Sequence, residues 1–275
     1  MCDGDTCQAR SIDRRRLIRI SALELGALGL GAAAIGARRV RFAGAQEEDA
    51  HWTYEGETGP ENWGELDPDY AACSTGEAQS PIDLADPTGQ DLVNVTIAYQ
   101  PASPLKIINN GHTIQVNIDP GSTVEIDGVA FELKQFHFHT PSEHAIDGEH
   151  QAMEMHLVHK TADDETAVLG VLLSEGAGGV AFEPVFANLP PEEGPEQTVE
   201  ATVNPADLLP AVGTTYRYGG SLTTPPCTEG VHWLVFTESV VVSTEQVEAF
   251  RAIIAANNRP LQPANERTIE EDATA

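Results

Sequence analysis

The sequence predicts a mainly β, α+β fold of mostly antiparallel strands, and three observations support this prediction. Short segments rich in β-branched and aromatic residues recur from residue 93 onward, and Gly, Asn, Asp or Pro lies between most of them. Patterns typical of helices are few. No internal repeat and no Gly/Ser linker divides residues 50 to 268, so we expect one domain there.

The expected elements follow one another closely along the chain. The segments that read as strands are 93–99, 105–108, 112–118, 123–126, 131–139, 152–159, 167–173, 215–218 and 231–236. One segment reads as a helix, because Ser243 and Gln246 form a capping pattern ahead of Val247, Phe250 and Ile254 at helical spacing.

The N-terminal 45 residues differ from the rest of the chain. Basic residues around Arg14–Arg16 precede an uncharged run from residue 25 to residue 37, and further arginines follow it. The run is too short to cross a bilayer and resembles the apolar core of a twin-arginine export signal, with a small-x-small cleavage site at residues 43–45. We therefore expect residues 1–45 to be a signal peptide, residues 46–268 to form the domain and residues 269–275 to be a disordered tail. An uncleaved N-terminal anchor is the alternative.

Cysteine usage agrees with export to the periplasm or the cell exterior. Cys2 and Cys7 lie in the expected signal, so the mature chain keeps only Cys73 and Cys227. In an oxidising compartment a disulfide between them is favoured over two free thiols.

The mature chain is strongly acidic. It keeps 7 of the 15 basic residues and 39 of the 43 acidic ones, which gives a net charge of about −32. Nucleic acid is an unsuitable partner, because few cations are available to neutralise phosphates. The acidity indicates either a surface adapted to high salt or a general compositional bias, and no membrane span is expected in the mature form.

Two of the expected strands place histidines on a common face. Within 131–139, His137 and His139 alternate with two phenylalanines, so both imidazoles point to one side. Antiparallel pairing with 152–159 would bring His156 beside them. Three imidazoles can bind zinc and leave a fourth position for water.

A His-x-His strand taken alone could equally be a surface pair or a satisfied pair in the core. Gln135 and Glu154 argue against that alternative here. Each lies two residues before a histidine and on the same face, where a hydrogen-bond acceptor would orient a metal ligand.

Several short motifs occur in the order found in the α-class carbonic anhydrases. They are QSPIDL (79–84), NNGH (109–112), QFHFH (135–139), SEH (142–144), MEMHLVH (153–159) and SLTTPP (221–226). The sequence resembles this family from residue 51 to residue 263. The resemblance implies a single domain with a central, twisted, mostly antiparallel sheet of about ten strands, a few surface helices and zinc at the base of a conical cleft.

The resemblance also implies a role for each residue of the metal centre. The zinc ligands are His137, His139 and His156. The groups that orient them are Gln135, Glu154 and the backbone carbonyl near Asn257. The catalytic residues are His112 as proton shuttle, and Glu143 with Thr223 as the pair that orients the nucleophile.

The remaining matched residues form the walls of the cleft and a disulfide. The substrate-binding residues are Val158, Val168, Leu222, Thr224, Val231 and Trp233. The polar side that holds ordered water is formed by Tyr54, Asn110 and Gln115. The cysteines Cys73 and Cys227 match the disulfide of secreted members.

The implied activity is the zinc-dependent, reversible hydration of carbon dioxide to bicarbonate and a proton by attack of zinc-bound hydroxide, with ester hydrolysis as a side activity. Its partners are small molecules, and a homodimer is expected because bacterial members are often dimers. A catalytically silent binding domain is one alternative, but such domains typically lose a ligand histidine. A zinc hydrolase is another, but the aspartate-histidine pair that closes the metallo-β-lactamase motif is absent.

Overall fold

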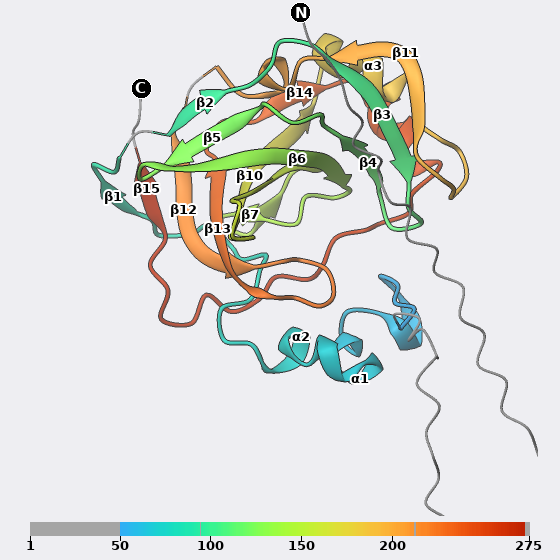
Figure 1. Cartoon of the computed structure of the whole chain (residues 1–275). Coiled ribbons are helices and arrows are strands. Elements are labelled where there is room, and N and C mark those ends of the chain that lie inside the picture. Colours follow the sequence, from blue (N-terminus) through green and yellow to red (C-terminus); the bar gives the residue numbers. More distant parts are fainter. Residues whose placement is uncertain (1–49, 94, 212, 273–275) are drawn as a thin grey trace, which may run out of the picture. The chain divides into compact units, whose positions relative to one another are not determined.

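One 13-stranded sheet is the framework of residues 50–93, 95–211 and 213–272, which are the residues described by the computed structural model (Figure 1). Its strands are β1 (Thr88–Gln90), β2 (Thr96–Ala98), β3 (Ser103–Asn109), β4 (Ile114–Asn117), β5 (Thr123–Ile126), β6 (Val129–His139), β9 (Met153–Lys160), β10 (Thr166–Glu175), β11 (Gln197–Val203), β12 (Thr215–Ser221), β13 (Glu229–Phe236), β14 (Val240–Val242) and β15 (Glu270–Asp272). A separate hairpin pairs β7 (Ala145–Ile146) with β8 (Glu149–His150).

The order of the strands confirms a mixed but mostly antiparallel sheet. The main path is β1-β15-β12-β13-β10-β9-β6-β4-β3-β11, with β2 paired to β5, β5 also to β6, and β14 to β10. The parallel pairings within the described residues are β1 with β15 and β10 with β13 and β14. The central strands β6, β9 and β10 are among the longest.

The helices are short and lie outside the sheet (Figure 1). The α-helices are α1 (Trp63–Leu66), α2 (Ala72–Thr75), α3 (Glu183–Phe186) and α4 (Thr244–Arg251), and the 3₁₀ turns are Gly56–Thr58, Pro68–Tyr70, Val180–Phe182 and Pro205–Leu208. Helix α4 begins at the predicted cap, since the Ser243 and Gln246 side chains bond each other's backbone N–H groups.

The structure differs from the expected elements in several places. Strand β4 begins at Ile114 instead of residue 112, because the Asn110 side chain accepts hydrogen bonds from the N–H groups of His112 and Thr113 and forms a turn. The expected strand 93–99 is limited to β2, and strands β1, β7, β8, β11 and β14 were not predicted. The expected disordered tail at 269–275 is corrected in part, because Glu270–Asp272 pair with β12 and β1 as β15. The expected signal, residues 1–45, lies outside the described residues.

The two faces of the sheet have different contents. One face packs the main apolar core, into which β9 sends Met153, Met155 and Leu157. The opposite face of β9 carries Glu154, His156 and Val158, because neighbouring side chains of a strand point in opposite directions. The predicted metal centre therefore lies on the face away from the main core.

A β-bulge in β6 lets this strand contribute apolar side chains to the main core along its whole length and histidines to the opposite face. Phe131 and Leu133 are buried in the main core, and so are Phe136 and Phe138, although the two pairs differ by an odd number of positions. The register between β6 and β9 shifts between Leu133 and Gln135. An extra residue in the strand changes which positions face the core, so the histidines face the other side.

The predicted disulfide joins Cys73 in α2 to Cys227, which lies between β12 and β13, with an S–S distance of 2.04 Å. The buried Arg259 side chain reinforces this corner by donating to the backbone oxygens of Cys73 and Ser80, at 2.9 and 2.8 Å. Helix α2 is thus fixed to the loop between β12 and β13, which carries Thr223. None of the helices in the described ranges is long and apolar enough to cross a membrane.

Candidate metal centre

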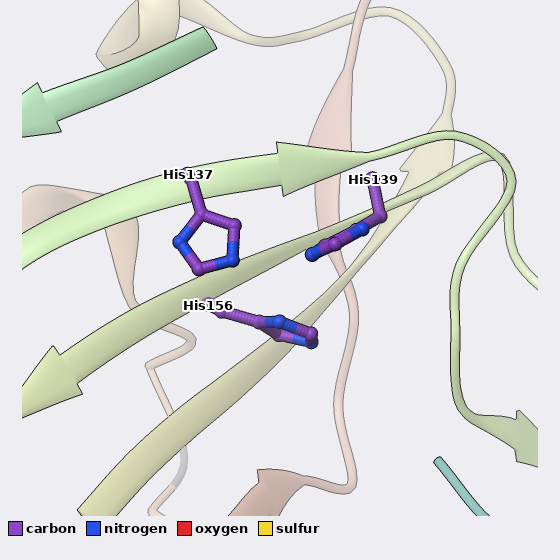
Figure 2. Close-up of side chains that lie close together, drawn as sticks. All are labelled: His137, His139 and His156. Carbon is purple, nitrogen blue, oxygen red and sulfur yellow. The ribbon is translucent and has the colours of Figure 1, made fainter. Parts of the chain in front are cut away.

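Three histidines from adjacent strands point toward one another (Figure 2). His137 and His139 lie on β6, and His156 lies on β9 directly opposite His137 in the antiparallel register. One ring nitrogen from each lies within 4.8 Å of those of the other two. The cluster is the one that the alternation of the two strands predicted.

Each of the three rings is oriented by a hydrogen bond at its other nitrogen. His137 Nδ1 donates to Gln135 Oε1 at 2.9 Å, His139 Nδ1 to the Asn257 carbonyl at 2.7 Å, and His156 Nε2 to Glu154 Oε1 at 2.9 Å. Carbonyl and carboxylate oxygens can only accept, so these nitrogens carry the protons. The inward nitrogens of neutral rings therefore present lone pairs to a common point.

Burial keeps the three imidazoles neutral. It is the largest cause that lowers their pKa values: that of His137 lies well below its usual range, that of His139 falls to about 4, and that of His156 is also lowered. His139 Nε2 is buried and has no hydrogen-bond partner among the described residues. An unpaired buried nitrogen is costly, and a metal ion at the common point would satisfy it.

A buried carboxylate lies beside the histidines. Glu143 Oε1 accepts a hydrogen bond from the Arg259 backbone N–H at 2.8 Å and lies 3.5 Å from His139 Nδ1. Burial raises the pKa of Glu143 to about 7, although His156, the Arg259 amide and the Thr223 hydroxyl each lower it. Glu143 Oε2 has no hydrogen-bond partner among the described residues, and Thr223 is buried.

The expected apolar wall is one continuous cluster. Val168, Val231 and Trp233 are buried together, with Val158 and Leu222 packed against them. The Trp233 ring lies 4.8 Å from the His156 ring, so the cluster reaches the metal centre. Thr224 is partly buried at the same loop, where its carbonyl accepts from the Cys227 N–H.

The residues expected on the polar side have definite positions. The Asn110 side-chain oxygen forms the turn before β4, and Gln115 pairs with His137 in the sheet while its Nε2 donates to Asn117 at 2.7 Å. Burial and the nearby charge of Glu143 raise the pKa of Tyr54 well above its usual range. His112 is half-buried and stacks on Trp52, with ring centroids 3.7 Å apart.

Sequence reasoning did not find a buried hydrogen-bond chain behind Glu154. Glu154 Oε1 also accepts a hydrogen bond from His144 Nδ1 at 2.7 Å. The other ring nitrogen, His144 Nε2, is hydrogen-bonded to the Tyr218 hydroxyl at 2.6 Å, and that hydroxyl is hydrogen-bonded to Ser80 Oγ at 2.9 Å. Burial alone would raise the pKa of Glu154, but the two histidines lower it well below its usual range. In the sequence, the residue that could have indicated this series of hydrogen bonds is His144 of the SEH motif, which is not one of the three expected ligands.

Gly170 provides the space that Glu154 needs. It pairs with His156 across β9 and β10, and a Cβ atom there would lie 3.0 Å from Glu154 Oε1. A side chain at this position would push on the carboxylate, because such a contact is tighter than normal packing allows.

Comparisons with known proteins agree with the geometry. A family model described as eukaryotic-type carbonic anhydrase matches residues 58–273. A carbonic anhydrase from Pectobacterium carotovorum is 42% identical over 231 residues, which cover 84% of this chain and 94% of that protein.

Solved structures show the same likeness. The α-carbonic anhydrase of Thermovibrio ammonificans, in complex with sulfanilamide, has a TM-score of 0.79 at 44% identity, covering 81% of this chain and all of that one. A hyperthermostable carbonic anhydrase from a hydrothermal vent chimney has a TM-score of 0.78 at 46% identity, with the same coverage.

Proposed function

Because this chain belongs to the eukaryotic-type, or α-class, carbonic anhydrase family and catalyses the reversible hydration of carbon dioxide, we propose that a zinc ion held by His137, His139 and His156 supports that reaction. The observation that carries the proposal is the convergence of three ring nitrogens within 4.8 Å of one another, among them the unpaired Nε2 of the buried His139. The donor set fits, since three neutral imidazoles suit zinc and leave its fourth position open. Zinc would supply a Lewis acid that lowers the pKa of water to about 7, the value established for carbonic anhydrases as a class.

Glu143 and Thr223 orient the nucleophile. Glu143 Oε1 is occupied by the Arg259 N–H, which leaves Oε2 to accept the proton of the Thr223 hydroxyl. A hydroxyl that donates to Glu143 can only accept a second hydrogen bond from within the site. Thr223 therefore fixes the direction in which the attacking oxygen presents its lone pair, and it discriminates against groups that lack a proton to donate.

The apolar cluster receives the substrate. Carbon dioxide is linear and nonpolar, so it is held by the wall of Val158, Val168, Leu222, Val231 and Trp233 and not by a charged clamp. The contact of Trp233 with the His156 ring brings this wall against the metal centre. Thr224 completes the substrate-binding set, and Tyr54, Asn110 and Gln115 form the polar side, where ordered water is expected.

His112 carries the proton out of the site. Hydration releases one proton per turnover, and water alone accepts it poorly near neutral pH. Imidazole has an ordinary pKa near 6.5, so a half-buried histidine at the rim can take the proton and release it to buffer. The His112 ring stacks on that of Trp52.

Export and assembly complete the proposal. Residues 1–45 serve as the export signal, and residues 46–268 form the mature domain, to whose sheet β15 (Glu270–Asp272) adds a further strand. The Cys73–Cys227 disulfide supports an oxidising compartment, because such bonds persist there. A homodimer stays a prediction of the family resemblance alone, and light scattering on the mature protein would check it.

The zinc ligands are tested by metal analysis of two matched variants. His139→Ala removes a buried ligand, whereas His150→Ala removes an exposed histidine outside the cluster. After dialysis against a weak chelator, the parent and His150→Ala should retain one zinc per chain and stopped-flow carbon dioxide hydration, and His139→Ala should retain neither. A folded His139→Ala protein with one tightly held zinc would refute the assignment.

A further inference from the structure

The acidic, proline-rich loop at residues 190–195 contacts the turn that carries His112. Asn109 Nδ2 donates to the Pro190 carbonyl at 3.2 Å, and the Gly194 N–H donates to the Asn109 carbonyl at 3.0 Å. Just beyond the loop, Asn117 Nδ2 donates to Glu196 Oε2 at 2.6 Å. Three hydrogen bonds therefore fix the loop and the residue after it to β3 and β4, the strands on either side of the turn.

Gly111 shows how close the loop approaches. Its φ of +84° lies in the left-handed region that favours glycine. A Cβ atom on Gly111 would lie 3.0 Å from Glu193 Oε2, so the absent side chain leaves space for that carboxylate. Glu193 is thus placed over the peptide unit next to His112.

The charged groups around His112 come from four segments. His51 lies with its ring 6.5 Å from that of His112, and Glu193 approaches from the loop. His112 lines two cavities, one of about 480 Å³ with Asp69 and one of about 390 Å³ with Glu55. The segment 253–257, which also lines the second cavity, contributes no titratable side chain to it. Carboxylates therefore outnumber other charged groups at this rim.

Hydrogen bonds hold the backbone of the turn, and stacking holds the His112 imidazole. The His112 N–H donates to Asn110 Oδ1 at 3.0 Å, and the His112 carbonyl accepts from Asn257 Nδ2 at 3.0 Å. The ring lies parallel to that of Trp52, with an angle of 5° between the planes. The imidazole is therefore held next to the Gly111 peptide, against which the exposed Glu193 carboxylate lies.

We propose that Glu193 is a positioning residue for proton export, whose carboxylate stabilises the protonated form of His112 and so sets the pH range over which His112 works. The proposal rests on the shuttle role given above. Glu193 does not touch the substrate or the metal centre. It acts through His112 alone.

The balance of effects on His112 is consistent with this role. Burial is the largest cause that lowers the pKa of His112, His51 lowers it further, and Glu193 opposes both. Without the carboxylate the imidazole would protonate only at lower pH, and its rate of accepting a proton near neutral pH would fall. Because Glu193 is exposed, added salt should weaken its effect.

The test compares Glu193→Gln with Glu192→Gln in the zinc-loaded mature enzyme. Both variants remove one negative charge from the same loop, but only Glu193 lies against Gly111. The His112 imidazole is titrated by NMR, and the maximal hydration rate is measured against pH in dilute buffer. In Glu193→Gln both midpoints should fall by about half a pH unit at low salt, with kcat/KM for carbon dioxide at high pH unchanged.

Further arms separate a local effect of Glu193 from a general effect of loop charge. The shift should largely disappear in 1 M sodium chloride, and Glu193→Asp should restore part of it. An equal shift in Glu192→Gln, or no shift in Glu193→Gln, would overturn the proposal. His112→Ala tests the shuttle separately, because a parental rate in dilute buffer would remove that role while the NMR titration still decides whether Glu193 acts on His112.

Discussion

Strand β9 carries two buried histidines, three residues apart, in opposite environments. His156 points to the metal centre, with Nε2 donating to Glu154 and Nδ1 facing the cluster. His159 points into the main core, where its Nε2 pairs with the Tyr99 hydroxyl at 2.7 Å and the two rings stack 5.8 Å apart. Both side chains are almost inaccessible to solvent.

The difference shows that burial does not make a histidine a ligand. In each ring one nitrogen has a hydrogen-bond partner; the other faces two further imidazoles in His156, whereas in His159 it has no partner among the described residues. A neighbouring Glu154 and two further imidazoles define His156 as one corner of a cluster, whereas His159 has one phenol and a hydrocarbon core around it. Residue type and burial are shared, so the partners decide the role.

The largest expected effect separates the two histidines by activity. His156→Gln should lower carbon dioxide hydration by at least about 1,000-fold, near 4 kcal/mol of activation free energy, because the metal loses a ligand. His159→Gln should stay within about twofold of the parent, since it lies across the sheet from the cluster. Stopped-flow rates on zinc-loaded proteins would check both, and comparable losses would break the contrast.

The next effect concerns acid stability and His159. Burial lowers the pKa of His159 to about 4 from its ordinary 6.5, so the folded state resists protonation. This contribution is fully present above pH 6.5 and is lost as pH falls toward 4, at a cost of at most about 3 kcal/mol. Urea unfolding at pH 7, 5 and 4 should show a steeper fall for the parent than for His159→Gln. Parallel curves would remove His159 as a cause.

A smaller effect should arise from the hydrogen-bond chain behind His156. Tyr218→Phe leaves His144 Nε2 buried without its partner, which should cost about 1–3 kcal/mol of unfolding free energy. Because His144 also holds Glu154, zinc should dissociate about tenfold faster. Tyr99→Phe removes the matching phenol from His159 and is the control, with a similar loss of stability but parental zinc release.

Salt should produce the smallest effect. Between 0.01 M and 1 M sodium chloride the Debye length falls from about 30 Å to about 3 Å, so self-repulsion of the acidic surface weakens and Tm should rise by a few degrees. The stability difference between His159→Gln and the parent should not change, because buried groups are screened little. If Tm does not change with salt, repulsion between the negative charges does not limit the stability of the folded protein.

Much of the metal centre could be predicted because it depends on strand alternation. Positions 137 and 139 share a face in any strand, and His156 needed only an antiparallel neighbour. The helix at Ser243 was equally local, since its capping box is complete within four residues.

Other features depend on contacts between distant residues and could not be predicted in this way. The parallel pairing of β10 with β13 joins strands far apart in the sequence, and the three acidic residues of β15 have no strand preference of their own. The β6 bulge is different, because the sequence does indicate it: the buried apolar residues change from odd positions at 131 and 133 to even positions at 136 and 138.

The late position of two contacts with the metal centre determines when it can form. The Asn257 carbonyl orients His139, and the Arg259 N–H holds Glu143, although both histidine strands are complete about a hundred residues earlier. During synthesis the strands β6 and β9 can pair before this segment exists, but the ligand and the carboxylate stay unfixed until it docks. The fully oriented ligands are therefore available to a metal ion only after nearly the whole chain has been synthesised. Nascent chains that stop before residue 257 should bind zinc only weakly.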